Sequence, residues 1–173
     1  MRLEPPSARA AAEFIAAVQR SRKLHAPWIR PPSTEAAYRA FVRRSHSPSH
    51  VAFLIRLRGT GELVGVVAMS EIVRGALRSA YLGYYAFAPH HGRGLMREGL
   101  ALVIRRAFRE LRLHRLEANI QPGNRASLRL IRRLGFRREG YSPGYLKIRG
   151  RWRDHERWAL LAVSPRHSAR RAA

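Results

Sequence analysis

The amino-acid sequence predicts an α/β fold in which helices cover both sides of one central sheet. Strand-like apolar segments alternate along the chain with segments whose apolar residues recur at the 3.6-residue period of a helix. Twice, over 81–111 and over 113–136, a strand pattern passes through a glycine-containing turn directly into a helix. Because each helix must bury its apolar stripe on a sheet, this order gives a three-layer arrangement.

The length and composition indicate one domain with a proper core. The chain has 173 residues, of which 46% are hydrophobic. We expect a domain over 1–164 and a disordered basic tail over 165–173. No segment approaches the ~20 apolar residues of a membrane span, and cysteine, which disulfides and thiolate metal sites need, is absent. A cytoplasmic protein without a secretory signal or membrane contact is the simplest expectation.

The first third of the chain predicts two helices. Residues 1–3 predict a short strand, and 7–20 predict a helix capped by its serine, with apolar residues on one face. The segment 22–33 holds three prolines and predicts a loop. A second helix, capped by its threonine, is expected over 34–45.

The rest of the chain continues the alternation of strands and helices and ends in a β-hairpin. Asn124 is a suitable N-cap and Gly135 a suitable residue after the end of the last helix. Further helices are expected over 96–111 and 124–134. Strands are expected over 50–58, 62–73, 81–87, 114–120, 136–148 and 151–163.

The loop between the 81–87 strand and the next helix has the chemistry of an anion site. Gly92 and Gly94 permit positive φ and let a ligand approach the backbone closely. A loop that curls into a helix start directs unpaired N–H groups and the positive end of the helix dipole to one place, which suits a phosphate. An ordinary turn is the alternative. The loop does not match the dinucleotide-binding motif G-x-G-x-x-G, because Arg97 occupies the position of its last glycine.

The sequence resembles the GNAT acetyltransferase superfamily over nearly its whole length. The first and last of the motifs that carry this resemblance are also similar to the ribosomal-protein alanine N-acetyltransferase branch. The motifs are His25-Ala26-Pro27-Trp28, Gly92-x-Gly94, Asn124-x-x-Ser127 with Leu134-Gly135-Phe136, and Tyr145-Leu146-Lys147-Ile148-Arg149-Gly150-Arg151-Trp152-Arg153-Asp154-His155. The resemblance implies a mixed, mostly antiparallel sheet in which the 81–87 and 114–120 strands splay apart.

The resemblance also implies acetyl-CoA as cosubstrate, with no metal. Its pantetheine arm is expected in the gap between the splayed strands, paired with backbone near Phe87 and Ala88. The residues that would bind it are Phe87, Ala88, His91, Gly92, Arg93, Gly94, Leu95, Met96, Asn124 and Ser127. Trp28 and Tyr145 are expected to contact the acceptor, although plain packing is the alternative for both. The adjacent His90 and His91 lack a nearby carboxylate and predict surface histidines rather than a metal site.

Candidate catalytic groups follow from the same resemblance. Glu117, out of phase with its apolar neighbours, is the first candidate for general base; a solvated or arginine-paired glutamate is the alternative, and Glu71 is the second candidate. Ser127 is the candidate to orient the leaving thiolate, since Ile131 stands where many relatives have a tyrosine; a capping serine is the alternative. Tyr141 and Tyr145 are reserve acids. Gly144 replaces an acid common in the ribosomal branch.

The net charge is extreme. Subtracting 11 acidic from 34 basic residues gives +23, nearly all of it arginine. Contact with RNA or the ribosome would use this charge; an arginine-rich genome is the other explanation. The expected acceptor is a protein N-terminus, such as that of a ribosomal protein. A small-molecule amine and a non-enzymatic RNA- or ribosome-binding module are the alternatives, in a monomer or homodimer.

Overall fold

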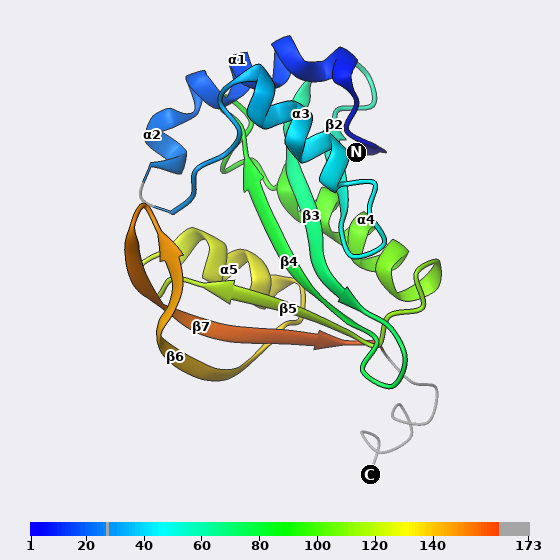
Figure 1. Ribbon diagram of the computed structural model, residues 1–173, viewed down its shortest axis with the longest axis vertical. Helices are drawn as coiled ribbons and strands as arrows, with labels where there is room; N and C mark the ends of the chain where they lie inside the picture. The colour runs from blue at the N-terminus through cyan, green and yellow to red at the C-terminus, as the bar shows by residue number, and fades with distance from the viewer. Residues whose placement is uncertain (27, 163–173) are drawn as a thin grey trace.

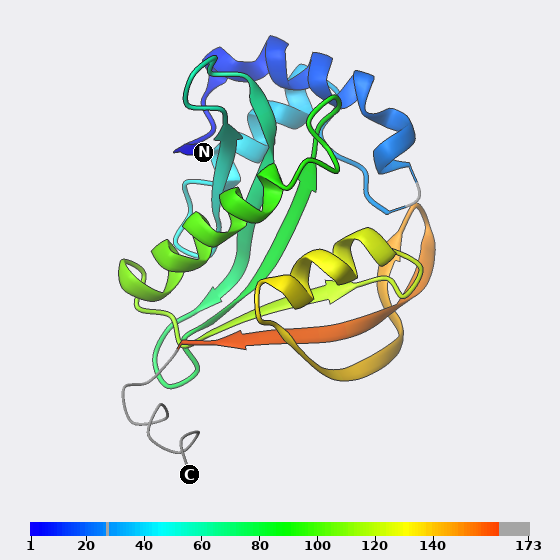
Figure 2. The same ribbon diagram turned by 180° about the vertical axis from the view of Figure 1, so that it is seen from behind.

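The computed structural model describes residues 1–26 and 28–162 and has the predicted α/β fold, a seven-stranded mixed sheet with helices on both faces (Figures 1 and 2). The strands are β1 (Arg2–Glu4), β2 (Val51–Arg56), β3 (Leu63–Val73), β4 (Ser79–Ala86), β5 (Arg115–Ile120), β6 (Arg137–Ile148) and β7 (Arg151–Leu161). The helices are the 3₁₀ turn η1 (Ala8–Ala10), α1 (Ala11–Arg20), α2 (Arg22–His25), α3 (Glu35–Arg44), α4 (Leu95–Arg109) and α5 (Arg125–Arg133).

Two apolar clusters hold the layers together, one on each face of the sheet. On one face, Phe14 of α1 and Tyr38 of α3 pack on Leu54 of β2. On the other, α4 and α5 contribute Leu100 and Ile131, among other residues. Because β2 is covered on both faces, five of its six residues are buried, which explains its continuous apolar run.

The strand order is β1-β2-β3-β4-β5-β7-β6, and β4 with β5 is the parallel pair. This ladder is short: it joins Ser79–Tyr81 to Arg115–Glu117 and then stops. The β3–β4 ladder continues to Ala86, so the second half of β4 stays paired on one side only. Figure 1 shows β4 and β5 diverging from their common end. The predicted splay and mixed sheet are confirmed.

Two expectations for the N-terminal region were wrong. The segment 22–33 contains the short helix α2, because the prolines begin only after its last turn. Ser7 makes no side-chain cap; its carbonyl oxygen instead accepts a hydrogen bond from the Tyr38 hydroxyl. Thr34 does cap α3, accepting from the N–H of Ala37. Pro27, Val163 and the predicted tail 165–173 lie outside the described residues, so the domain boundary stays a prediction.

No helix among the described residues is long and apolar enough to cross a membrane. The helix α4, the longest of them, spans 15 residues and has an arginine-rich outer face.

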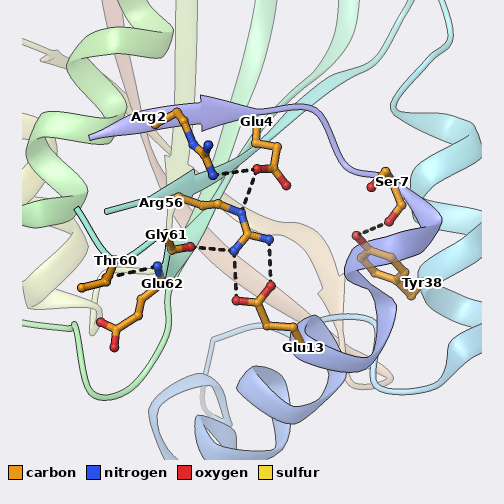
Figure 3. Close-up of polar contacts among 9 residues, drawn as sticks. All are labelled: Arg2, Glu4, Ser7, Glu13, Tyr38, Arg56, Thr60, Gly61 and Glu62. Carbon is orange, nitrogen blue, oxygen red and sulfur yellow. Dashed lines mark hydrogen bonds and ion pairs between the residues drawn. The ribbon is translucent and has the colours of Figure 1, made fainter. Parts of the chain in front are cut away.

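A buried arginine ties three elements together (Figure 3). Arg56, at the end of β2, donates to both carboxylate oxygens of Glu13 on α1, at 2.9 and 2.7 Å. Its Nε lies 3.0 Å from a carboxylate oxygen of Glu4 in β1, and it also donates to the carbonyl oxygen of Gly61. The hydrogen bonds to Glu13 make the largest contribution to the raised pKa of Arg56.

We expect the substitution Arg56→Met to lower the free energy of unfolding by about 1–3 kcal/mol. Removing one partner from a buried ion pair costs about 3–5 kcal/mol, and here Glu4 and Glu13 are partly solvated, which reduces the cost. Urea unfolding at neutral pH measures the difference.

The matched control is Arg39→Met, which removes an arginine paired with Glu35 on the exposed surface of α3. Exposed pairs contribute about 0–1 kcal/mol. Equal losses in the two variants would contradict a special role for Arg56.

Candidate active site

A cavity of about 540 Å³ lies beside the free half of β4. The end of β4 and the start of α4 bound it on one side, and α5 bounds it on the other. The α2 helix and the segment after it close a third side, where Trp28 and Ile29 line the space. Trp28 is held there by the Gln121 side chain, which donates to its carbonyl oxygen at 3.1 Å.

The loop before α4 has the backbone geometry expected of an anion site. Gly92 and Gly94 have φ of 75° and 80°, and a Cβ on either would project into open space. From Gly92 to Met96 the backbone N–H groups donate to no backbone oxygen of the described residues. These N–H groups lie at the positive end of the α4 dipole and can bind phosphate oxygens.

The start of α5 faces the same cavity. Asn124 caps this helix, its Oδ1 accepting from the N–H of Ser127 at 3.1 Å. Arg129 and Arg133 follow along the helix and line the cavity, together with Arg97 of α4. Three guanidinium groups beside an open backbone loop favour a polyanionic ligand.

A hydroxyl pair bridges the two sides of the cavity. The Tyr84 hydroxyl on β4 is hydrogen-bonded to Oγ of Ser127 on α5, and both residues line the cavity. Burial raises the pKa of Tyr84 far above its ordinary value. The phenol therefore keeps its proton at neutral pH, because its charged form would lose hydration.

Two side chains from the α1–α2 region bind the end of β4. His25 Nε2 donates to the Ala86 carbonyl oxygen at 2.7 Å, and Ser21 Oγ accepts from the Ala88 N–H at 2.9 Å. Burial lowers the pKa of His25, although its bond to Ala86 acts against this. His25 is therefore a neutral imidazole whose Nε2 carries the proton.

Several backbone groups at Phe87 and Ala88, the expected partners of a pantetheine arm, already form hydrogen bonds within the protein. The Phe87 N–H donates to Val64 and its carbonyl oxygen accepts from His90, while Ser21 occupies the Ala88 N–H. The Phe87 ring itself is fully buried in the core. The role of Phe87 and Ala88 in cofactor binding stays a prediction, and these bonds from distant parts of the chain cannot be read from the strand pattern.

Most other predicted cofactor residues lie on the cavity. The structure brings together there His91, Gly92, Gly94, Met96, Asn124, Ser127 and the proposed acceptor residue Trp28. Arg93 and Leu95 belong to the same loop and first turn but do not line the space. His90 is not a surface residue: it is 6% exposed and lies 3.4 Å from a carboxylate oxygen of Glu62. No group of His, Asp or Glu in the described chain could hold a metal.

The predicted catalytic carboxylates lie elsewhere. Glu117 accepts a hydrogen bond from Arg115 at 2.8 Å and is absent from the cavity lining. Arg115 also pairs with Glu139. Glu71, at a bulge in β3 with φ of 49°, lies 3.8 Å from His50 and outside the cavity. The catalytic role of Glu117 stays a prediction.

The reserve acids also lie outside the cavity lining. The Tyr145 hydroxyl donates to the Tyr81 hydroxyl at 3.4 Å. This hydrogen bond makes the largest contribution to the pKa of Tyr81, which is raised to about 12. Tyr141 donates to Asp154, which also accepts from the Gly144 N–H. These bonds join β6 to β7 and to β4.

Sequence reasoning missed several cavity residues, among them His25, Tyr84, Arg97, Arg129 and Arg133. His25 was quoted only as part of a motif, and Tyr84 reads as one aromatic among several in its strand. The arginines stand in a sequence so rich in arginine that no local signal distinguishes them.

Comparisons with known proteins show the family of this chain. The model of the acetyltransferase (GNAT) domain family matches residues 1–137. The probable N-acetyltransferase YjcK of Bacillus subtilis (strain 168) is 43% identical over 99 residues, 57% of this chain and 55% of that protein. The uS5-alanine N-acetyltransferase of Escherichia coli (strain K12) is 46% identical over 99 residues, 57% of this chain and 51% of that protein. The chain thus spans about half the length of these curated relatives.

A solved structure is similar over a longer stretch. Mycobacterium smegmatis RimJ in complex with CoA-disulfide has 30% identity and a TM-score of 0.82, covering 98% of this chain and 88% of that one. The ribosomal-protein-S5-alanine acetyltransferase of Vibrio fischeri has 25% identity and a TM-score of 0.81, with 92% and 91% covered. With the family model matched over most of its length, this chain belongs to the GNAT acetyltransferase family, whose members use acetyl-CoA.

Proposed function

We propose that this protein transfers the acetyl group of acetyl-CoA to the N-terminal α-amine of a protein, by direct attack of the amine in a ternary complex. The cavity beside β4 carries this proposal, because a loop with open N–H groups and a partly buried hydroxyl pair border one space there. The printed name of the Escherichia coli relative supports a ribosomal protein as the acceptor.

The residues of the cavity fit coenzyme A. The open N–H groups from Gly92 to Met96 suit its pyrophosphate, and Arg97, Arg129 and Arg133 supply positive charge beside them. When bound, acetyl-CoA supplies a thioester that reacts with a neutral amine. The Ser127 hydroxyl lies on the wall of this cavity and can donate to a sulfur placed there.

The proton affinity of the acceptor amine favours an N-terminal α-amine over a lysine amine. An α-amine has a pKa of about 7.7–8.0 and a lysine amine about 10.4, so the lysine costs roughly 3.5 kcal/mol more to deprotonate. No carboxylate lines the cavity in the described residues to carry that cost. An N-terminal amine, already partly neutral at pH 7, is therefore the better substrate.

The charge of +23 bears on the other candidates. A surface this basic disfavours a polycationic small molecule. The structural likeness to spermidine N-acetyltransferase of Vibrio cholerae, at 21% identity, concerns the fold alone. Ribosome contact through the arginines remains part of the proposal, and the open glycine loop argues against a purely non-enzymatic role.

The direct test is mass spectrometry of protein N-termini from cells with and without this protein. We expect one or a few ribosomal proteins to lose N-terminal acetylation when it is absent, and the purified protein to acetylate a peptide with the same first residues. Unchanged N-termini, with acetylation of small amines in vitro, would contradict the proposed acceptor.

The variant Gly94→Val should bind acetyl-CoA at least tenfold more weakly, as measured by calorimetry. Its side chain would project into the open space before the α4 N–H groups, and φ of 80° is unfavourable for valine. The matched control is Gly75→Val, which has the same kind of strain at φ of 68° and open surroundings in the turn after β3. Equal affinity in both variants would exclude this loop as the binding site.

If Glu117 is the general base, Glu117→Gln should lower kcat/KM for an alanine-starting peptide at pH 6.5 by about 10², the low end for such catalysis. The loss should shrink above pH ~8, where the free α-amine no longer needs a base. Glu139→Gln, which removes the other carboxylate of Arg115, is the control for the loss of an ion pair. A wild-type rate in Glu117→Gln at pH 6.5 removes Glu117 from the mechanism.

A further inference from the structure

We propose that Tyr84 is a positioning residue that holds the Ser127 hydroxyl in line with the sulfur of coenzyme A during acetyl transfer. The inference rests on the proposed function and adds a residue to it. Tyr84 touches no reacting atom in this scheme; it acts through Ser127.

The contact between Tyr84 and Ser127 lies beside the free part of β4. The β4–β5 ladder ends at Tyr81, and Tyr84 lies three residues further along β4, where the strand no longer has a partner on that side. From there its hydroxyl reaches the first turn of α5. Because both residues line the cavity, the contact lies on the border of the space in which the reaction would occur.

Ser127 is fixed at two points. Its N–H is bound by the Asn124 side chain, which sets the position of the backbone. Its Oγ is bound by Tyr84, which restricts the rotation of the side chain. A helix-capping role would need only the first of these bonds, so the second requires its own explanation.

Either hydroxyl of the pair can donate to the other. Burial raises the pKa of Tyr84, so its phenol keeps the proton that it can donate at neutral pH. If the phenol donates to Oγ, the proton of the Ser127 hydroxyl is free to point into the cavity. The carbonyl oxygen of Ser127 is a poorer acceptor for Tyr84, at 3.5 Å.

Ser127 and Tyr84 have different roles in the acetyl-transfer step. The amine nitrogen bonds to the acetyl carbon as the carbon–sulfur bond breaks, the bonding pair leaves on sulfur, and the amine proton goes to solvent or to a general base. Ser127 donates a hydrogen bond to that sulfur, and Tyr84 donates one to Ser127. A thiol has a pKa near 8.5 and a free phenol near 10. Tyr84, raised further by burial, therefore keeps its proton, and its contribution is positional.

The experiment measures the ionisation of bound coenzyme A, which needs no acceptor amine. The pKa of the bound thiol is followed by the ultraviolet absorption of its thiolate, in the wild type, Tyr84→Phe, Ser127→Ala and the double variant. We expect Tyr84→Phe and Ser127→Ala each to lower the thiolate fraction at a given pH about three- to tenfold, the effect of one hydrogen bond. The double variant should match Ser127→Ala alone.

Turnover gives a second readout. In Tyr84→Phe, kcat should fall about three- to tenfold while KM for acetyl-CoA stays unchanged, because the bond matters only when charge develops on sulfur. The matched control is Tyr38→Phe, which removes a buried tyrosine hydroxyl bound to Ser7, away from the cavity. This control should leave the thiol pKa at the wild-type value.

Each outcome separates the hypotheses. Failure of the wild type to bind coenzyme A would overturn both the proposed function and this inference. Normal binding with the same thiol pKa in the wild type, Tyr84→Phe and Ser127→Ala would overturn the inference alone. Additive losses in the double variant would show a merely structural role for Tyr84. Should Tyr84→Phe not fold, an unchanged thiol pKa in Ser127→Ala would be sufficient to reject the inference.

Discussion

The short parallel ladder between β4 and β5 is the constraint on which the site depends. After three residue pairs the strands separate, and the second half of β4 keeps only its β3 partner. An open strand edge exposes N–H and C=O groups that must find partners or contact water or a ligand. The cavity beside β4 is the space that this separation creates, and the Gly92–Gly94 loop and α5 are placed at its border because they follow directly from the two strands.

The free edge of β4 is partly filled by side chains from the N-terminal region. Ser21 and His25, one helical turn apart, bind the Ala88 N–H and the Ala86 carbonyl. Leaving such buried groups unpaired would cost about 1–3 kcal/mol each. The same bonds attach α2, which precedes Trp28, to the end of β4, so two walls of the cavity form one connected unit.

Charge is distributed according to burial. Among the described residues Arg56 is the only buried arginine, and it pairs with carboxylates of β1 and α1. A guanidinium taken out of water needs such partners. The other arginines of the described residues are partly or fully exposed, and their positive field favours an anionic ligand at the open loop.

The sequence by itself determined the order of helices and strands, the glycine loop, the Asn124 cap and, through its motifs, the family. These features are local: a cap, a positive φ or an apolar period depends on residues within a few positions. Only the tertiary structure decided which side chains share the cavity. Tyr84 and Ser127 are 43 positions apart, and His25 and Ala86 are 61 apart. Glu117 illustrates the same limit, since its strand position was readable but its pairing with Arg115 was not. Contacts of this kind depend on where β4 and β5 separate, and that divergence is set by the packing of whole layers rather than by any one segment.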